Sequence, residues 1–230
     1  HNCVTIGEVL GPVGYRTIQT GKWHVGGAKK EWWPTRRGFD RVFGSPLGGG
    51  CYFRPSAFYS YREVVRNETV LYTPKKDPPK GWYTTDAYTD EGLAFVREAI
   101  DEAKPFFWYL AYNAPHWPLR AKPEDIAKYR GKYRIGWDKV RQQRHARLVE
   151  LGLIESKWDL SPRDGTVPAW SKLSEKQKDE QDHIMATYAA MIDCVDQNMG
   201  KIVRELKKLD EFENTLILFL CDNGGSSEPS

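Results

Sequence analysis

The order of periodic segments along this 230-residue chain predicts an α/β fold with a mostly parallel sheet. Amphipathic, helix-like segments alternate with apolar, strand-like runs in the order helix, strand, helix, strand, helix, strand. Two of these runs, 106–112 and 215–221, are apolar at almost every position, which is typical of strands covered by helices on both faces. The length allows one sizeable core, so a single domain is expected.

Each expected element has its own local signal. Gly14 is a typical residue just beyond a helix C-terminus, and the β-formers on either side of 66–69 indicate a hairpin. Ser174 with Gln177 forms a capping box that starts the longest helix, whose apolar residues recur at spacings of three and four and predict a core-facing stripe. The elements expected in chain order are a helix at 4–13, strands at 15–20 and 41–43, a hairpin at 62–72, a helix at 85–103, a strand at 106–112, helices at 123–129 and 137–151, a loop at 160–170, the long helix from 174, and a strand at 215–221.

Composition is that of a globular protein with a mild positive charge. The chain is 40% hydrophobic and 28% charged, and its net charge is +3. No dense basic stripe predicts nucleic-acid binding, and no apolar run reaches the roughly 18 to 20 residues of a membrane span, so neither partner is expected. The four cysteines lack a C-x-x-C spacing, and Cys194 and Cys221 are expected to be small buried core residues.

Polar groups that bind anions or metals follow three of the predicted strands. Lys22 and His24 follow the first strand, His116 follows the strand at 106–112, and Asp222 with Asn223 follows the strand at 215–221. Ligands of open α/β sheets bind outside the carboxyl ends of the strands. We therefore expect all five side chains at one edge of a single sheet, with their tips within roughly 10 to 12 Å.

The chemistry of each group has a functional and a purely structural interpretation. If 22–24 stays extended, Lys22 and His24 project from one face, with Trp23 opposite, and suit an oxyanion such as sulfate or phosphate. The structural interpretation is an exposed lysine and a hydrogen-bonded histidine on a loop. Asp222 and Asn223 offer hard oxygen ligands for Ca²⁺ or Mg²⁺, but Asp-Asn-Gly is also a common turn.

His116 lies between two prolines that restrict the backbone around it, and Asn113 and Trp117 are candidates to orient its ring. Histidine is well suited to protonate a leaving oxygen near neutral pH. The alternative is a structural histidine that caps a strand end.

Taken together, several segments resemble the sulfatase family. The segment 14–26 is similar to the second sulfatase signature, and Arg37-Gly38-Phe39-Asp40 resembles a segment of bacterial arylsulfatases. Further similar segments, which extend the resemblance over nearly the whole chain, are 114–119, 129–133, 136–153, 160–163, 168–170 and 221–224. The resemblance implies an alkaline-phosphatase-like fold, with a large mixed, mostly parallel sheet between helices and a smaller C-terminal subdomain after it.

The resemblance also implies a site and a reaction, the hydrolysis of sulfate esters. Sulfatases use a formylglycine nucleophile made from Cys or Ser in a C/S-x-P/A-x-R motif, together with a divalent cation, usually Ca²⁺ and otherwise Mg²⁺. By matching motif, Lys22 would contact the sulfate and the nucleophile's oxygen, and His24 would hold the formylglycine hydrate. His116 would bind sulfate and protonate the leaving alcohol. Asp222 and Asn223 would be two of the metal ligands.

Three features of the family pattern are missing from residues 1–230. No C/S-x-P/A-x-R occurs, and Cys51 is rejected as the nucleophile because its neighbours are in the wrong order and it lies downstream of Lys22 and His24. The paired acidic metal ligands and the second active-site lysine of the family are also absent. We therefore expect 1–230 to be the central and C-terminal part of a single catalytic domain, without the nucleophile region and the C-terminal subdomain, and to be inactive alone.

Several alternatives remain open at this point. A phosphodiesterase or phosphonate hydrolase of the same superfamily, or a non-catalytic relative that binds sulfated glycans, also fits the segments in view. The expected partner is a small-molecule or carbohydrate sulfate ester. The resemblance favours the periplasm or secretion, with the cytoplasm as the alternative, and the oligomeric state is open.

Overall fold

A computed structural model describes residues 3–48, 52–55 and 63–221 of the chain. These residues fall into two compact units. The sheet unit comprises His1–Arg120 and Ile192–Ser230, and the helical unit comprises Ala121–Met191. All of the strands among the described residues lie in the sheet unit.

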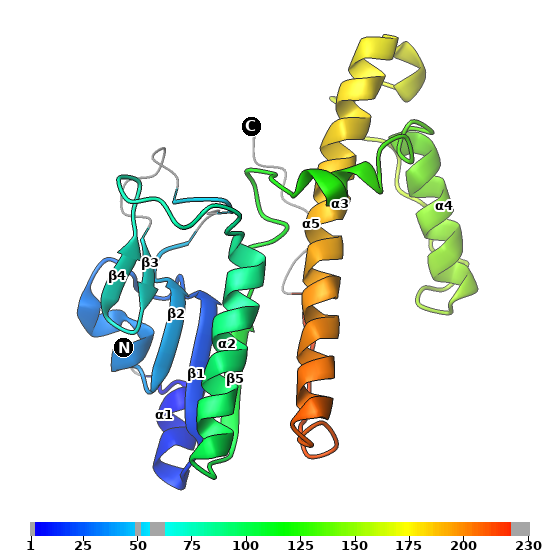
Figure 1. The fold of residues 1–230 in the computed structure, drawn as a ribbon. Coiled ribbons are helices and arrows are strands. Elements are labelled where there is room, and N and C mark those ends of the chain that lie inside the picture. The colour runs from blue at the N-terminus through cyan, green and yellow to red at the C-terminus, as the bar shows by residue number, and fades with distance from the viewer. Residues whose placement is uncertain (1–2, 49–51, 56–62, 222–230) are drawn as a thin grey trace. The chain divides into compact units, whose positions relative to one another are not determined.

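A five-stranded mixed sheet organises the sheet unit, in the order β4-β3-β2-β1-β5 (Figure 1). β1 is parallel to both β2 and β5, whereas β3 is antiparallel to β2 and to β4. The arrangement confirms the predicted α/β class, the parallel strands and the hairpin. The strands are β1 (Arg16–Lys22), β2 (Arg41–Ser45), β3 (Val64–Arg66), β4 (Thr69–Tyr72) and β5 (Phe106–Ala111).

The segment predicted as a single helix at 4–13 is an α-helical turn followed by a 3-10 turn. Thr5 caps α1 with a capping box, in which its side chain accepts from the Glu8 amide while the Glu8 side chain accepts from the Thr5 amide. Gly14 has φ 97° and ends this segment, as predicted. The helical elements before β5 are α1 (Ile6–Leu10), η1 (Gly11–Val13), η2 (Lys30–Trp32), η3 (Pro34–Arg36) and α2 (Thr84–Asp101).

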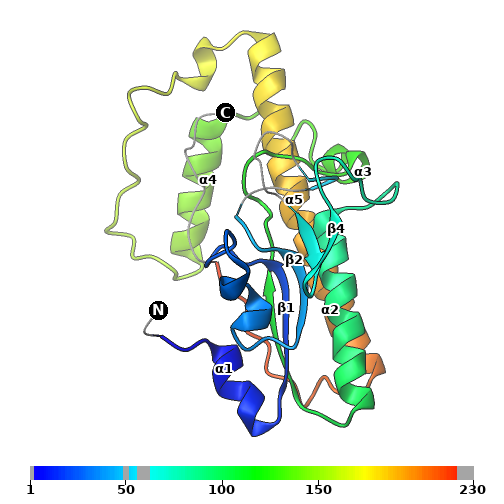
Figure 2. The ribbon, with the colours of Figure 1, turned by 90° about the vertical axis from the view of Figure 1, so that its left-hand side faces the viewer.

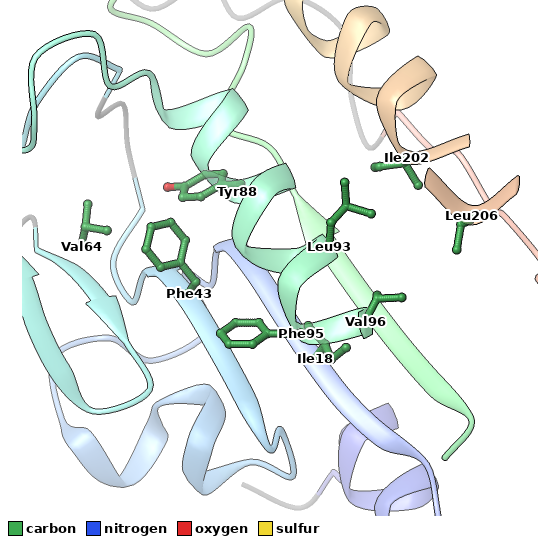
Figure 3. Packing of buried hydrophobic residues seen from close by; sticks show 9 residues of the cluster. All are labelled: Ile18, Phe43, Val64, Tyr88, Leu93, Phe95, Val96, Ile202 and Leu206. Carbon is green, nitrogen blue, oxygen red and sulfur yellow. The ribbon is translucent and has the colours of Figure 1, made fainter. Parts of the chain in front are cut away.

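Helix α2 lies along one face of the sheet (Figures 1 and 2). Its apolar side chains pack against alternate residues of the strands, because successive side chains of a strand point to opposite faces. In Figure 3 the rings of Phe43 and Tyr88 lie close together, 6.1 Å between centroids, and Ile18 of β1 lies beside Val96. The other face carries a second cluster of Trp23, Trp33, Phe39, Val42 and Val65.

The C-terminal half of α5 (Glu175–Lys208) packs on α2 within the sheet unit. Ile202 and Leu206 point toward α2 in Figure 3 and belong to the same buried cluster as its side chains. The buried Asn198 donates to the Asp86 carboxylate at 2.8 Å, and Cys194 is 1% exposed, which confirms it as a small core residue. The predicted apolar stripe therefore faces a core over this half of the helix.

The helical unit contains α3 (Pro123–Ala127), α4 (Trp137–Glu150), η4 (Trp170–Lys172) and the first half of α5. The predicted capping box is present, with the Gln177 amide donating to Ser174 Oγ and the Ser174 amide donating to Gln177 Oε1. The buried carboxylate of Asp182 accepts from the Arg130 guanidinium at 2.6 Å and from the Gly131 amide at 2.8 Å. One carboxylate on α5 thus holds the loop between α3 and α4.

The prediction of a buried strand at 215–221 is wrong for the described residues. The segment forms no ladder, and Leu216, Leu218 and Leu220 are 84%, 75% and 83% exposed. Cys221 is also exposed rather than buried. A strand needs a hydrogen-bonded neighbour, and apolar sequence alone does not supply one.

β5 is also less covered than its sequence predicts. It ends the sheet order, so one of its two edges has no strand beside it among the described residues. Tyr109 is 44% exposed on this strand, although continuous apolar sequence predicts burial on both faces. None of the helices in the described part is long and apolar enough to cross a membrane.

Candidate active site at the carboxyl edge of the sheet

Two glycines bring the strands together immediately before the predicted site residues. Gly21 is the register partner of Ala111 on β5 and of Gly44 on β2. Gly21 has φ 108°, and a Cβ at this position would lie 2.0 Å from the Ala111 carbonyl oxygen. Only glycine tolerates both this backbone conformation and this close approach. The last paired residues of β1 and β5 therefore lie one residue before Lys22 on β1.

Lys22 ends β1 at the carboxyl edge, as predicted. Its register partner is Ser45 of β2, and the next amide, that of Trp23, donates to the Ser45 carbonyl at 3.0 Å. Trp23 is buried in the cluster on the face opposite α2, and its indole donates to the Trp32 carbonyl. The Lys22 side chain is half-buried at this edge. Trp23 therefore acts as an anchor for the end of β1.

The backbone at His24 is not extended. The prediction that Lys22 and His24 project from one face required an extended backbone over 22–24. The φ of His24 is 53°, so the chain turns after Trp23 and Lys22 and His24 do not continue one strand. The His24 amide donates to the Pro46 carbonyl, and its ring lies against Gly48, where a Cβ would approach to 2.4 Å. The loop after β2 thus holds this histidine close to the end of β1.

His116 lies in a turn directly after β5. The His116 amide donates to the Asn113 carbonyl at 2.9 Å, and both Ala114-Pro115 and Trp117-Pro118 are cis peptides. The His116 Nδ1 lies 2.6 Å from the Trp117 carbonyl oxygen. A carbonyl only accepts hydrogen bonds, so Nδ1 carries the hydrogen and Nε2 is the nitrogen left for chemistry. Trp117 therefore orients the ring through its backbone.

The structure brings the end of β1 and the turn after β5 to one sheet edge. β1 and β5 are adjacent and parallel, and their last paired residues, Gly21 and Ala111, stand one residue before Lys22 and two before Asn113. Asp222 and Asn223 lie outside the described residues, so the predicted convergence of all five side chains stays a prediction. Lys22 and His116 share the edge that the sequence assigned to them.

The described side chains at this edge include a cation, Lys22, and the imidazole of His116. Within residues 3–48, 52–55 and 63–221 no group of three His, Cys, Asp or Glu side chains could hold a metal ion. Asp222 and Asn223, whose carboxylate and amide oxygens are ligand types that Ca²⁺ and Mg²⁺ take, lie outside the described residues.

Several residues near this edge carried no signal in the sequence. Ser45 is 3% exposed, and its hydroxyl has no hydrogen-bond partner among the described residues. Tyr112 follows β5, its hydroxyl lies 2.6 Å from Thr89 Oγ1, and burial raises its pKa, so it stays neutral. The Tyr52 hydroxyl donates to the His116 carbonyl at 2.6 Å. No local sequence motif marks these residues. Only the fold brings them close to this edge of the sheet.

The motif Arg37-Gly38-Phe39-Asp40 has a structural role in the described residues. The Arg37 guanidinium pairs with Glu8 of α1, and the Thr17 hydroxyl of β1 donates to the Gly38 carbonyl. The Asp40 carboxylate accepts from the Thr17 amide. The motif therefore joins α1 to the start of β1.

Comparison with known proteins shows which family has this mixed α/β sheet with a polar carboxyl edge. The family model for sulfatases matches residues 1–230, and the chain belongs to the sulfatase family. It is 34% identical over 223 residues to an uncharacterized sulfatase of Schizosaccharomyces pombe, covering 94% of this chain and 40% of that protein. It is 32% identical over 225 residues to an arylsulfatase of Klebsiella aerogenes, covering 96% of this chain and 47% of that protein.

A solved structure also shares the fold. The crystal structure of Ps i-CgsB in complex with k-i-k-neocarrahexaose is 28% identical, with a TM-score of 0.57, and the match covers 91% of this chain and 37% of that one. The predicted alkaline-phosphatase-like fold is confirmed by these matches. The chain spans less than half the length of these relatives.

Proposed function

We propose that the whole protein hydrolyses sulfate esters at the carboxyl edge of this sheet. The observation that carries the proposal is the placement of Lys22 and of the His116 turn after neighbouring parallel strands. A cation and an imidazole at one edge suit a sulfuryl group whose leaving oxygen needs a proton. The family match supports the reaction class.

The roles follow from the side chains and their surroundings. The Lys22 ammonium would bind a sulfate oxygen and stabilise the charge that builds on it during transfer. His116, with Nδ1–H held by the Trp117 carbonyl, would protonate the leaving alcohol oxygen from Nε2. A protonated Nε2 gives up its hydrogen, so the alcohol leaves neutral and the imidazole returns to its neutral form.

Two groups absent from the described residues complete the proposal. A formylglycine residue would supply the nucleophile for sulfur, and Ca²⁺, or alternatively Mg²⁺, would offset the negative charge of the sulfate. His24 would hold the nucleophile's hydrate, and Asp222 and Asn223 would provide two of the metal's oxygen ligands.

Aryl and carbohydrate sulfates are the proposed substrate classes. Similarity to an arylsulfatase favours the first, and similarity to a protein solved with k-i-k-neocarrahexaose favours the second. We assign the substrate class as small-molecule or carbohydrate sulfate esters.

The test is sulfate release by the whole protein from p-nitrophenyl sulfate and from sulfated oligosaccharides, with and without a chelator. We expect turnover that falls on chelation and returns with Ca²⁺. Turnover of a phosphodiester or phosphonate instead of any sulfate ester would replace the proposal with the phosphodiesterase alternative. Tight binding of sulfated oligosaccharides without release of sulfate would replace it with a non-catalytic glycan-binding function.

A further inference from the structure

Tyr52 connects the start of α2 to the turn that carries His116. It belongs to neither a helix nor a strand, yet only 1% of its surface is exposed. Its hydroxyl lies 2.6 Å from the His116 carbonyl oxygen and 3.2 Å from the Asn113 carbonyl oxygen. Both acceptors are backbone groups of the same turn, so one hydroxyl proton is shared between the two ends of that turn.

The other end of Tyr52 is equally fixed. Its carbonyl accepts from the Thr84 amide at 2.8 Å and from the Thr84 hydroxyl at 3.0 Å. Thr84 is the first residue of α2, which packs along the sheet. The start of α2 therefore fixes the backbone of Tyr52, and the Tyr52 hydroxyl in turn fixes the backbone of the His116 turn.

A second tyrosine supports the first and binds the same segment further on. The Tyr83 ring stacks on Tyr52, with 6.0 Å between centroids and 26° between planes. Its hydroxyl donates to the Arg120 carbonyl at 2.8 Å. The segment 113–120 is thus held at both ends by tyrosine hydroxyls, but only Tyr52 binds the backbone of the histidine itself.

The His116 ring has little freedom once its backbone is fixed. Nδ1 is bonded to the Trp117 carbonyl, so the direction of Nε2 depends on where the His116 and Trp117 peptides lie. The Tyr52 hydroxyl binds the first of these peptides at its oxygen. Loss of this bond would let the turn shift, and proton transfer is sensitive to displacements of about 1 Å.

We propose that Tyr52 is a positioning residue that sets the direction of His116 Nε2 toward the leaving group. This inference rests on the proposed function, in which His116 is the general acid. The Tyr52 hydroxyl would act through the backbone carbonyls of Asn113 and His116, without contact to a reacting atom. Its role is therefore separable from substrate binding by Lys22.

The test compares Tyr52→Phe with Tyr83→Phe in the whole protein. Each variant removes one buried hydroxyl and keeps its ring, so the two are matched in packing, and only the first loses a bond to His116. We expect Tyr52→Phe to lower kcat on an alkyl sulfate by roughly 10- to 100-fold, with p-nitrophenyl sulfate changed by less than about threefold. Tyr83→Phe should change both substrates by less than about threefold, and KM should stay constant for both variants.

A His116→Ala background provides the second arm. If Tyr52 acts through His116, Tyr52→Phe should cause no further loss on the alkyl sulfate once His116 is absent. Equal losses on both substrates, or additive losses in the double variant, would overturn the positioning role and leave Tyr52 as a core residue.

A third arm does not depend on activity. In the whole protein labelled at histidine, the imidazole nitrogen signals of His116 should move in Tyr52→Phe and stay in place in Tyr83→Phe. If no sulfate ester is turned over by the wild type, the proposed function fails while this spectrum still tests the contact. Unchanged His116 signals in Tyr52→Phe would refute the inference even if the wild type is an active sulfatase.

Discussion

Single residues at the end of the β1–β5 pairing shape the carboxyl edge of the sheet. Gly21 permits β1 and β5 to approach until no side-chain atom fits between them, one residue before Lys22. Trp117 orients the His116 ring through its backbone carbonyl. Because this oxygen accepts from Nδ1, it determines which ring nitrogen of His116 carries the hydrogen. The backbone at these positions is as important as the side chains.

Replacement of Gly21 should lower the free energy of unfolding far more than replacement of another glycine with a positive φ. Gly21→Ala places a Cβ 2.0 Å from the Ala111 oxygen, whereas Gly14, with φ 97°, has open space around it. We expect Gly21→Ala to cost about 3 kcal/mol or more, and Gly14→Ala about 1 to 2 kcal/mol, in the free energy of unfolding. Denaturant unfolding of both variants measures the difference, and equal costs would show that the close approach is not rigid.

His116→Ala should reveal general-acid catalysis through its dependence on the leaving group. We expect kcat/KM on an alkyl sulfate to fall by about 10²- to 10⁴-fold, because a poor leaving group needs the proton. The loss on p-nitrophenyl sulfate should be about tenfold or less, since its leaving group is stable as an anion. Asp222→Ala is the control, and it should lower both rates alike by weakening the metal site. Equal losses for His116→Ala on the two esters would leave it only a sulfate contact.

At the scale of elements, the short α1 is attached to the sheet by polar contacts rather than by a large apolar face. Glu8 lies in its first turn and pairs with Arg37, whose guanidinium also donates to the Cys3 carbonyl. Hydrogen bonds from the Arg37 side chain and then from the Thr5 amide lower the pKa of Glu8. The attachment of this element should therefore depend on pH.

The stability that Glu8 contributes should disappear in acid. Its pKa is lower in the folded state than in the unfolded state, so its contribution is present above the usual value of 4.5 and is lost as pH falls through the folded pKa. We expect Glu8→Gln to lower Tm of the whole protein at pH 6 to 7, with a difference that shrinks below about pH 4. Glu150→Gln, which disrupts an exposed pair with Arg147, should have little effect at any pH. A constant difference for Glu8→Gln across this range would contradict the assignment.

The segment 215–221 shows how an element can have the sequence of a strand without forming one. Its leucines are exposed because no described strand lies beside it, and such a run promotes association between molecules. We expect Leu218→Lys to shift the 230-residue chain toward the monomer in light-scattering measurements. Val4→Lys, which changes a single 74% exposed apolar residue outside this run, should not. No shift for Leu218→Lys would mean that the segment is covered in solution.

For the molecule as a whole, the proposed formylglycine nucleophile leads to a prediction about activity. We expect the 230-residue chain alone to hydrolyse no sulfate ester, because no C/S-x-P/A-x-R motif is present to provide a formylglycine. Ca²⁺ binding should also be weak, since two ligands supply little of the six to eight oxygens that this ion takes. Release of p-nitrophenol from p-nitrophenyl sulfate by this chain would show that the nucleophile lies within it.

Much of the fold could be predicted because its signals are local. Apolar runs, the hairpin at 62–72, Gly14 and the capping box at Ser174 each depend on neighbours within a few residues, and the structure contains all of these elements except the strand at 215–221. The prediction of that strand was wrong because a strand forms only beside a hydrogen-bonded partner strand, which the local sequence does not reveal. The sheet edge of Lys22 and His116 followed from the parallel order of the strands.

The α/β class, the resemblance to sulfatases and the residue types that suit a sulfate ester could all be inferred from the amino-acid sequence. Those properties depend on periodicity and on motifs, which are written along the chain. Three features became visible only in the folded chain. His24 turns away from the extended backbone, the Trp117 carbonyl selects the His116 tautomer, and Tyr52 binds the His116 turn from 61 and 64 residues away. Each of these features depends on a hydrogen-bond acceptor or a steric contact that only folding brings within about 3 Å.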